Sequence, residues 1–180
     1  KGDNAAALPL LGAFVTANPQ SPFAPLALYM KGGAEIALDQ KTEGIATLTA
    51  VAENYPDSQP APFTYFTLAQ IAGSEGKSDE VVALMKKFIE KYPTDNKVYF
   101  AYEAIAQTAL NAGKTDDALG AYREYIQHDP DSPQAGEALY KVAEIQRAKA
   151  ESLGRYTALN DEERSNWKTL MDGSVASSEE

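Results

Sequence analysis

Four prolines stand at a constant spacing in this chain. Pro19, Pro56, Pro93 and Pro130 each follow the last by 37 residues. Their surroundings match as well, reading Asn-Pro-Gln-Ser, Tyr-Pro-Asp-Ser, Tyr-Pro-Thr-Asp and Asp-Pro-Asp-Ser. A second mark lies twenty residues after two of these prolines, in the segments Gly76-Lys77-Ser78-Asp79 and Gly113-Lys114-Thr115-Asp116. A period that is marked twice indicates an internal structural repeat.

Each repeat divides into two amphipathic helices, because its apolar residues recur at helical spacing. In one repeat these residues are Tyr65, Leu68, Ala69 and Ala72, then Val81, Leu84, Met85, Phe88 and Ile89. In the next they are Tyr102, Ile105, Ala106 and Ala109, then Ala118, Leu119, Tyr122, Tyr125 and Ile126. We expect Gly76 to end one helix and Ser78 to cap the next. No segment alternates at a period of two for long, so the sequence predicts an all-α protein.

The first full repeat departs from the pattern. It carries Gly32, Gly33 and Gly44 where small residues would let two helices approach closely. Its turn, Asp39-Gln40-Lys41, has no glycine, and we expect it to be one residue out of register.

Both ends also differ from the repeat. Residues 3–17 resemble a second helix without its first, which Pro9 is expected to fray or kink. Near the other end, Ser132 is a candidate cap for a helix that runs to about Leu153. A final helix is expected from Asn160, where Glu163 has capping-box spacing and Trp167, Leu170 and Met171 share a face.

The repeat predicts one continuous domain with internal boundaries. These divide the chain into a truncated repeat (1–18), three repeats (19–55, 56–92 and 93–129), and a degenerate fourth repeat with its capping helix (130–180). Since the chain starts with Lys1 and not Met, we expect the natural protein to extend further.

The residues at the marked positions resemble tetratricopeptide repeats (TPRs). The pattern appears as Ala69, Gly76, Val81, Met85, Phe88 and Pro93, and again as Ala106, Gly113, Ala118, Tyr122, Tyr125 and Pro130. The resemblance implies a right-handed α-solenoid of helix-turn-helix repeats with a non-repeat C-terminal helix. The usual period is about 34 residues. Longer units that close with Tyr-Pro-Asp-Ser resemble those of bacterial cell-envelope proteins, which implies a periplasmic or outer-membrane-associated location.

In this family, the first helices line a concave groove that binds a partner's peptide or helix. Transferred to this chain, the groove consists of Leu26, Tyr29, Phe63, Phe66, Gln70, Phe100, Glu103, Gln107, Asn111, Tyr140, Glu144 and Arg147. Packing against adjacent helices is the alternative for the phenylalanines; it has equal weight for Phe66 and is favoured for Phe100. Family members that clamp a terminal carboxylate use several Lys and Asn side chains. Here the groove has Arg147 alone as a base, which disfavours that class of ligand.

Composition and motifs argue against other functions. The 180 residues carry a net charge of −10, from 26 acids and 16 bases, and no segment concentrates bases, which disfavours nucleic acid. There is no cysteine and one histidine, His128, which we expect at a turn. Acid pairs stand where helices begin, as the helix dipole favours. We find no catalytic constellation, metal site or cofactor motif, so we expect neither an enzyme nor a cofactor. The apolar stretch from Ala5 to Val15 is shorter than the roughly 20 residues that span a bilayer.

The sequence therefore predicts a non-enzymatic adaptor or scaffold that binds a protein or peptide partner. One alternative is a structural spacer of a larger cell-envelope complex that assembles with itself as a homo-oligomer. Another is the recognition arm of an enzyme whose catalytic domain lies outside these residues.

Overall fold

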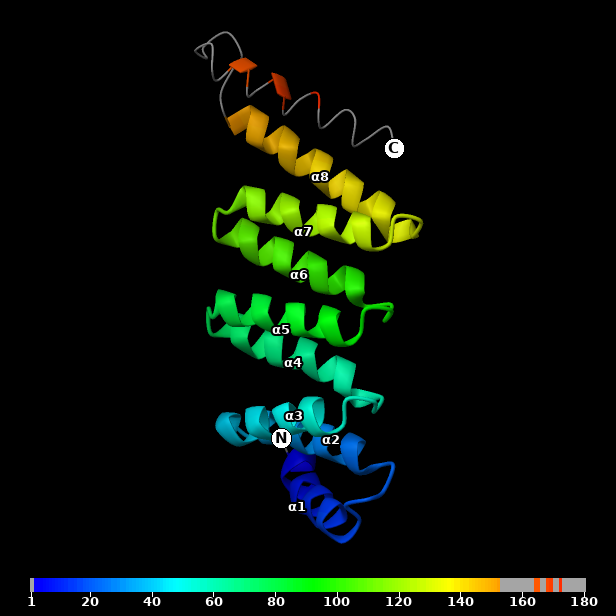
Figure 1. Ribbon diagram of the computed structural model, residues 1–180. Helices are drawn as coiled ribbons and strands as arrows, with labels where there is room; N and C mark the ends of the chain where they lie inside the picture. Colours follow the sequence, from blue (N-terminus) through cyan, green and yellow to red (C-terminus); the bar gives the residue numbers. More distant parts are fainter. Residues whose placement is uncertain (1, 153–163, 166–167, 170–171, 173–180) are drawn as a thin grey trace. The chain divides into compact units, whose positions relative to one another are not determined.

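A computed structural model describes residues 2–152, 164–165, 168–169 and 172, and Figure 1 shows its helices. Within those residues the chain forms eight α-helices, and no strand is present. The prediction of an all-α helical repeat fold is confirmed.

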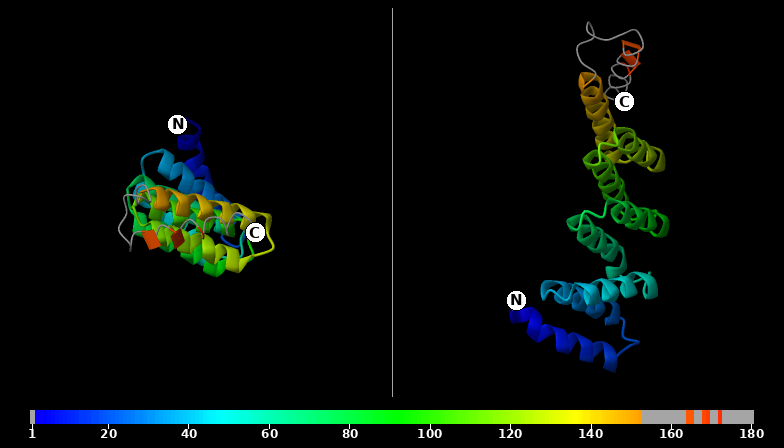
Figure 2. Two further views of the ribbon diagram at one scale, coloured as in Figure 1. Left: turned by 90° about the horizontal axis from the view of Figure 1, so that it is seen from above. Right: turned by 90° about the vertical axis from the view of Figure 1, so that its left-hand side faces the viewer.

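The chain divides into two compact units, residues 1–92 and residues 93–180. The first unit contains α1 (Gly2–Ala17), α2 (Ala24–Ala37), α3 (Lys41–Asn54), α4 (Pro60–Ser74) and α5 (Ser78–Lys91). The second contains α6 (Val98–Asn111), α7 (Thr115–His128) and α8 (Pro133–Ser152). Within each unit, every helix packs against the next one along the chain, as Figures 1 and 2 show. The division into repeats at residues 19, 56, 93 and 130, within one continuous domain, stays a prediction.

Glycines end two of the first helices as predicted. Gly76 and Gly113 have left-handed backbone conformations, with φ of 73° and 72°. This conformation turns the chain so that the following N–H can reach back into the helix. The N–H of Lys77 donates to the carbonyl of Ala72 at 3.0 Å, and the next repeat has the equivalent bond.

Asp39 takes the same conformation in the first repeat. Its φ is 65°, and the N–H of Gln40 donates to the carbonyl of Glu35 at 2.9 Å. Asp39 lies 37 residues before Gly76, so the prediction that this turn is out of register is wrong. Aspartate is one of the few side chains that tolerate left-handed backbone, which is why the turn survives without glycine.

The two predicted serine caps have different outcomes. Ser78 is the first residue inside α5, and its side chain makes no capping hydrogen bond, so that prediction is wrong. The cap position belongs to Lys77, since the tight turn at Gly76 places the helix start one residue earlier. Ser132 does cap α8, because the N–H of Ala135 donates to its Oγ at 3.2 Å.

Two glycines bring α2 and α3 into close contact. A Cβ added to Gly44 would lie 2.9 Å from the carbonyl oxygen of Gly32, and one on Gly32 would lie 2.8 Å from Leu48. These two glycines are therefore the small residues of the crossing, as predicted. Gly33 is not, because a Cβ there would meet nothing within 4 Å.

Aromatic rings fill the centre of each unit. In the first, the fully buried ring of Phe88 lies 4.9 Å from that of Phe66 and 5.5 Å from that of Tyr92. In the second, the Tyr125 ring lies 5.1 Å from that of Tyr99. These clusters tie second helices to first helices, so they hold the surfaces of the first helices in place.

α1 and α8 are the first and last helices in the described part of the chain. α1 is uninterrupted at Pro9, so the predicted fraying or kinking is not observed as a break in the helix. Pro9 removes one backbone donor from this helix, which packs against α2 along its length. α8 is described to Ser152. The helix predicted from Asn160, with Glu163, Trp167, Leu170 and Met171, falls outside the described residues.

Candidate functional site

The predicted groove residues lie on the first helix of successive pairs. Each unit therefore has its own candidate surface. We call Leu26, Tyr29, Phe63, Phe66 and Gln70 the α2–α4 face. The α6–α8 face consists of Phe100, Glu103, Gln107, Asn111, Tyr140, Glu144 and Arg147.

Large apolar side chains are exposed on both faces. Leu26 is 41% exposed, Phe63 44% and Phe100 52%. These three positions are 37 residues apart, and in each helix they lie on the side away from the buried stripe. The expectation that Phe100 packs into the core is wrong, because the neighbouring Tyr99 and Ala101 fill the interior instead.

A second row of residues is half-buried on the α2–α4 face. The ring of Phe66 stacks edge-on against that of Phe88, so Phe66 contributes to the core and to the surface at once. The hydroxyl of Tyr29 shares a hydrogen bond of 3.1 Å with that of Thr67, which joins α2 to α4. The α2–α4 face is therefore a mostly apolar surface whose Phe66 and Tyr29 side chains are held in place by contacts with neighbouring helices.

The equivalent row on the α6–α8 face is more polar. Glu103 is half-buried and Tyr140 is 58% exposed. The amide of Gln107 donates to the side-chain oxygen of Asn111 at 3.1 Å. Arg147 pairs with Glu151 at 2.9 Å.

Four residues that sequence reasoning missed belong beside this face: Tyr99, Tyr122, Glu137 and Lys141. Burial raises the pKa of Tyr122, and the carboxylates of Glu103 and Glu137 raise it further. Lys141 pairs with Glu144 at 3.1 Å, which lowers the pKa of Glu144. Glu137 follows Phe100 by 37 residues, so one more step of the period would have found it. Tyr122 had been predicted on the buried stripe of its helix, not at this face, and no comparable signal marks Tyr99.

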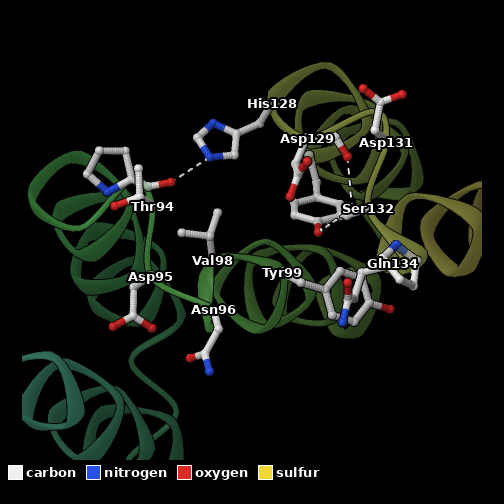
Figure 3. A pocket seen from close by; sticks show the side chains of 13 residues that line it. Thr94, Asp95, Asn96, Val98, Tyr99, His128, Asp129, Asp131, Ser132 and Gln134 are labelled. Atoms are coloured by element: carbon white, nitrogen blue, oxygen red, sulfur yellow. Dashed lines mark hydrogen bonds between the residues drawn. The ribbon is translucent and has the colours of Figure 1, made fainter.

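A hollow of about 430 Å³ lies in the second unit, where the segment before α6 meets the α7–α8 turn, and Tyr99 is among the residues that line it (Figure 3). His128 is at its edge and is the last residue of α7, so the expectation that it lies in a turn is wrong. Its Nε2–H donates to the carbonyl of Pro93 at 2.8 Å. The imidazole ring therefore has a structural role, because it joins the end of α7 to the segment before α6. Asp95, Asp129 and Asp131 also line the hollow.

The described residues contain neither a metal-binding cluster nor a membrane-spanning helix. No group of three or more His, Asp or Glu side chains there could hold a metal ion. Within the same residues, no helix combines the length and the apolar character needed to cross a membrane.

Comparison with known proteins identifies the family. The tetratricopeptide repeat profile matches residues 1–59 and 103–158, and the chain belongs to this family. A crystal structure of nearly identical TPR-like repeats, described as those of a kinesin light chain from Podosopora anserina, superposes with a TM-score of 0.56. It is 14% identical, and the alignment covers 98% of this chain and 87% of that one. A single-substitution variant of that protein gives the same values. No curated protein sequence matches this chain.

Membership in this family defines the general class of function. TPR domains are typically non-catalytic modules that bind protein partners, and the repeats indicate a protein–protein interaction scaffold. The 14% identity to solved structures shows the fold alone.

Proposed function

We propose that this chain is a non-enzymatic adaptor that binds a partner peptide or helix on its α2–α4 and α6–α8 faces. The observation that carries this proposal is the exposure of Phe63 and Phe100 at equivalent positions of two first helices. Exposed aromatic side chains next to amides and carboxylates are typical of binding surfaces, since they combine large contact area with hydrogen-bonding groups.

Burial of the opposite sides of these helices supports the same assignment. In α4, Tyr65, Leu68 and Ala69 are buried, and in α6 the equivalents Tyr102, Ile105 and Ala106 are buried. The buried stripes of both helices are therefore filled by other side chains. Phe63 and Phe100 keep large exposed areas that a partner can cover, although the Phe100 ring also lies 5.5 Å from that of Tyr99.

The experiment is a selection from a random-peptide phage library on the full chain, followed by affinity measurement with purified peptides. We expect the double variant Phe63→Ala/Phe100→Ala to lose at least tenfold in affinity, which is about 1.4 kcal/mol. Phe66→Ala is less suitable, because Phe66 also packs on Phe88.

The matched control is Leu10→Ala, which removes a 70% exposed apolar side chain from α1, outside both faces. This variant should bind as the parent does. Peptides whose affinity is unaffected by the double variant would show that the faces are not the binding site.

A second candidate is self-assembly as a structural spacer, which the apolar surface of α1 favours. Leu10 is 70% exposed and Phe14 is 36% exposed, and both lie on one helix. Apolar patches of this kind often mark contacts between proteins. A concentration-dependent mass in light scattering that Leu10→Glu abolishes would support it, and a monomer at all concentrations would contradict it.

Location in a bacterial cell envelope is also a proposal, supported by the resemblance of the 37-residue units, one of which closes with Tyr-Pro-Asp-Ser. The full-length reading frame tests it, because a signal peptide or lipid-attachment site would have to precede these residues. The same reading frame would reveal a neighbouring catalytic domain, for which these repeats would be the recognition arm.

A further inference from the structure

A groove with a mostly apolar lining lies at one end of the α6–α8 face. Its volume is about 440 Å³, and its apolar lining comes from Leu110 of α6 and from Ile145 and Ala148 of α8. The charged side chains that line it are those of Glu144 and Lys149. We call these five residues the end groove. Leu110 and Ile145 are half-buried and Ala148 is exposed, so part of the apolar lining is in contact with solvent.

The end groove continues the α6–α8 face along both helices. Leu110 follows Glu103 by seven residues, which is about two helical turns, so the two residues lie on the same side of α6. Ala148 follows Glu144 by four residues, which is about one turn of α8. A segment bound along the α6–α8 face therefore reaches the end groove.

The additional length of α8 supplies part of the lining. α8 has 20 residues, whereas α6 has 14. Ala148 lies 37 residues after Asn111, the last residue of α6, so residues 149–152 have no counterpart in that helix. Within this extension, Nζ of Lys149 lies 2.5 Å from Oδ1 of Asp116 on α7 (Figure 1). The ion pair joins the end of α8 to the start of α7, beside the groove.

Both charged side chains of the end groove are paired within the chain. Oε2 of Glu144 lies 3.1 Å from Nζ of Lys141, and Lys149 pairs with Asp116. A charged side chain from a partner would therefore lose its hydration without gaining an unpaired opposite charge. An apolar side chain has no such cost, and it gains free energy by covering the exposed apolar lining. The charge distribution thus favours an uncharged occupant.

We propose that the bound segment of the partner inserts an uncharged apolar side chain, such as that of leucine, into the end groove. The proposal rests on the proposed function and deepens it, because it names the chemistry of the bound segment. A few side chains that fill pockets supply most of the binding energy in many interfaces. The end groove is the place on the α6–α8 face where such an anchor side chain would be covered by both helices.

The test uses the phage selection on the full chain, repeated with Ala148→Phe. Because Ala148 is exposed and lines the groove, the new ring fills the groove without entering the core. We expect peptides selected by the parent to share one position occupied by leucine, isoleucine or methionine, and peptides selected by the variant to lose it. The control is Ala13→Phe, the same substitution at an exposed position of α1. This control should keep the shared apolar position.

Affinity measurements with one selected peptide complete the test. Replacing its apolar anchor by alanine should weaken binding to the parent chain at least tenfold. Lysine or glutamate at the same position should weaken binding at least as much, because the groove offers neither charge an unpaired partner. The alanine replacement should have little effect on binding to Ala148→Phe, in which the groove is already filled.

Two other occupants of the end groove would give different results. If the C-terminal residues of the chain fill it, Ala148→Phe should shift the fluorescence emission of Trp167, the only tryptophan, when no peptide is present. If a second copy of the chain fills it, Ala148→Phe should lower the mass measured by light scattering. Either result would overturn the assignment of the groove to a partner segment.

The outcomes separate this inference from the proposed function. Peptides without a shared apolar position, or an alanine effect that is the same in Ala148→Phe, would overturn the anchor site and leave peptide binding intact. If no peptide is selected, or if Phe63→Ala/Phe100→Ala binds as the parent does, the proposed function fails and this inference fails with it.

Discussion

Asp39 adopts the left-handed backbone conformation that Gly76 adopts 37 residues later, with φ of 65° against 73°. Both residues follow a first helix, and both let the next N–H bond back to a carbonyl five residues earlier. The geometry of the turn is therefore common to the two repeats, although the residue type is not. Aspartate adopts this backbone conformation at a cost in conformational free energy, because its Cβ is crowded in this region of φ and ψ.

Asp39→Gly should stabilise the chain by about 0.5–1 kcal/mol, because glycine relieves that crowding and partly offsets this gain through greater freedom when unfolded. The midpoint of urea unfolding measures the change. Gly113→Ala is the opposite substitution in an equivalent turn and should destabilise by about 1–2 kcal/mol. An Asp39→Gly midpoint below that of the parent would show that the aspartate side chain stabilises the turn.

Gly44→Ala should destabilise the α2–α3 pair by about 1–3 kcal/mol, because the new methyl group would overlap the backbone carbonyl of Gly32. Gly33→Ala is the matched control in the same region. Nothing lies within 4 Å of its Cβ, so we expect a gain of about 0.5–1 kcal/mol from the higher helix propensity of alanine. Denaturant midpoints that move in the same direction for both variants would refute a close helix crossing here.

In each unit, a side chain at the end of a predicted repeat donates a hydrogen bond to the backbone carbonyl of the proline that begins the same repeat. The hydroxyl of Tyr92 donates to Pro56 at 2.8 Å, and Nε2–H of His128 donates to Pro93 at 2.8 Å. Tyr92→Phe removes only the hydroxyl and should lower stability by about 0.5–1.5 kcal/mol. His128→Phe should do the same in the second unit. Thermal unfolding checks both, and unchanged midpoints would mean that water replaces these bonds without loss.

Tyr99→Phe should leave stability unchanged or raise it by about 1 kcal/mol, because it removes a buried hydroxyl that has no hydrogen bond of ordinary geometry. Tyr125→Phe is the control. Its hydroxyl shares a hydrogen bond of 2.9 Å with Ser132, so its loss should destabilise by about 0.5–1.5 kcal/mol. Equal destabilisation of the two variants in urea would show that the Tyr99 hydroxyl does have a partner in solution.

Glu75 makes the stability of the first unit depend on pH. Hydrogen bonds from Lys41 and then Lys77 lower the pKa of Glu75 from 4.5 to about 2. Because the folded pKa is the lower one, its contribution is complete above about pH 4.5 and disappears as the pH falls towards 2. Glu75→Gln should therefore unfold earlier than the parent in urea at pH 7, and the difference should vanish near pH 2. Salt should reduce the difference at pH 7, since the pair is partly exposed. A difference that is independent of pH would contradict this account.

Much of the fold follows from local sequence signals. α3, α5 and α7 begin at Lys41, Ser78 and Thr115, at the same spacing as the prolines. The buried sides of α5 and α7 were predicted because helical periodicity and turn residues act over a few neighbours. The turn at Asp39 was mistaken for a shifted one because two residue types can adopt the same backbone conformation, and sequence spacing then identifies the turn better than residue type does.

The sequence by itself determined that this chain is a series of helix pairs, because each helix needs only its own apolar stripe and its own stop signal. Only the tertiary structure decided which rings stay outside. Phe66 packs on Phe88 of α5 and is half-buried, whereas Phe63 and Phe100 are 44% and 52% exposed because they lie on the side of their helices away from the buried stripe. The contact between the Tyr99 ring of α6 and the Tyr125 ring of α7 was likewise decided there, because it joins side chains of separate helices and depends on how those helices pack.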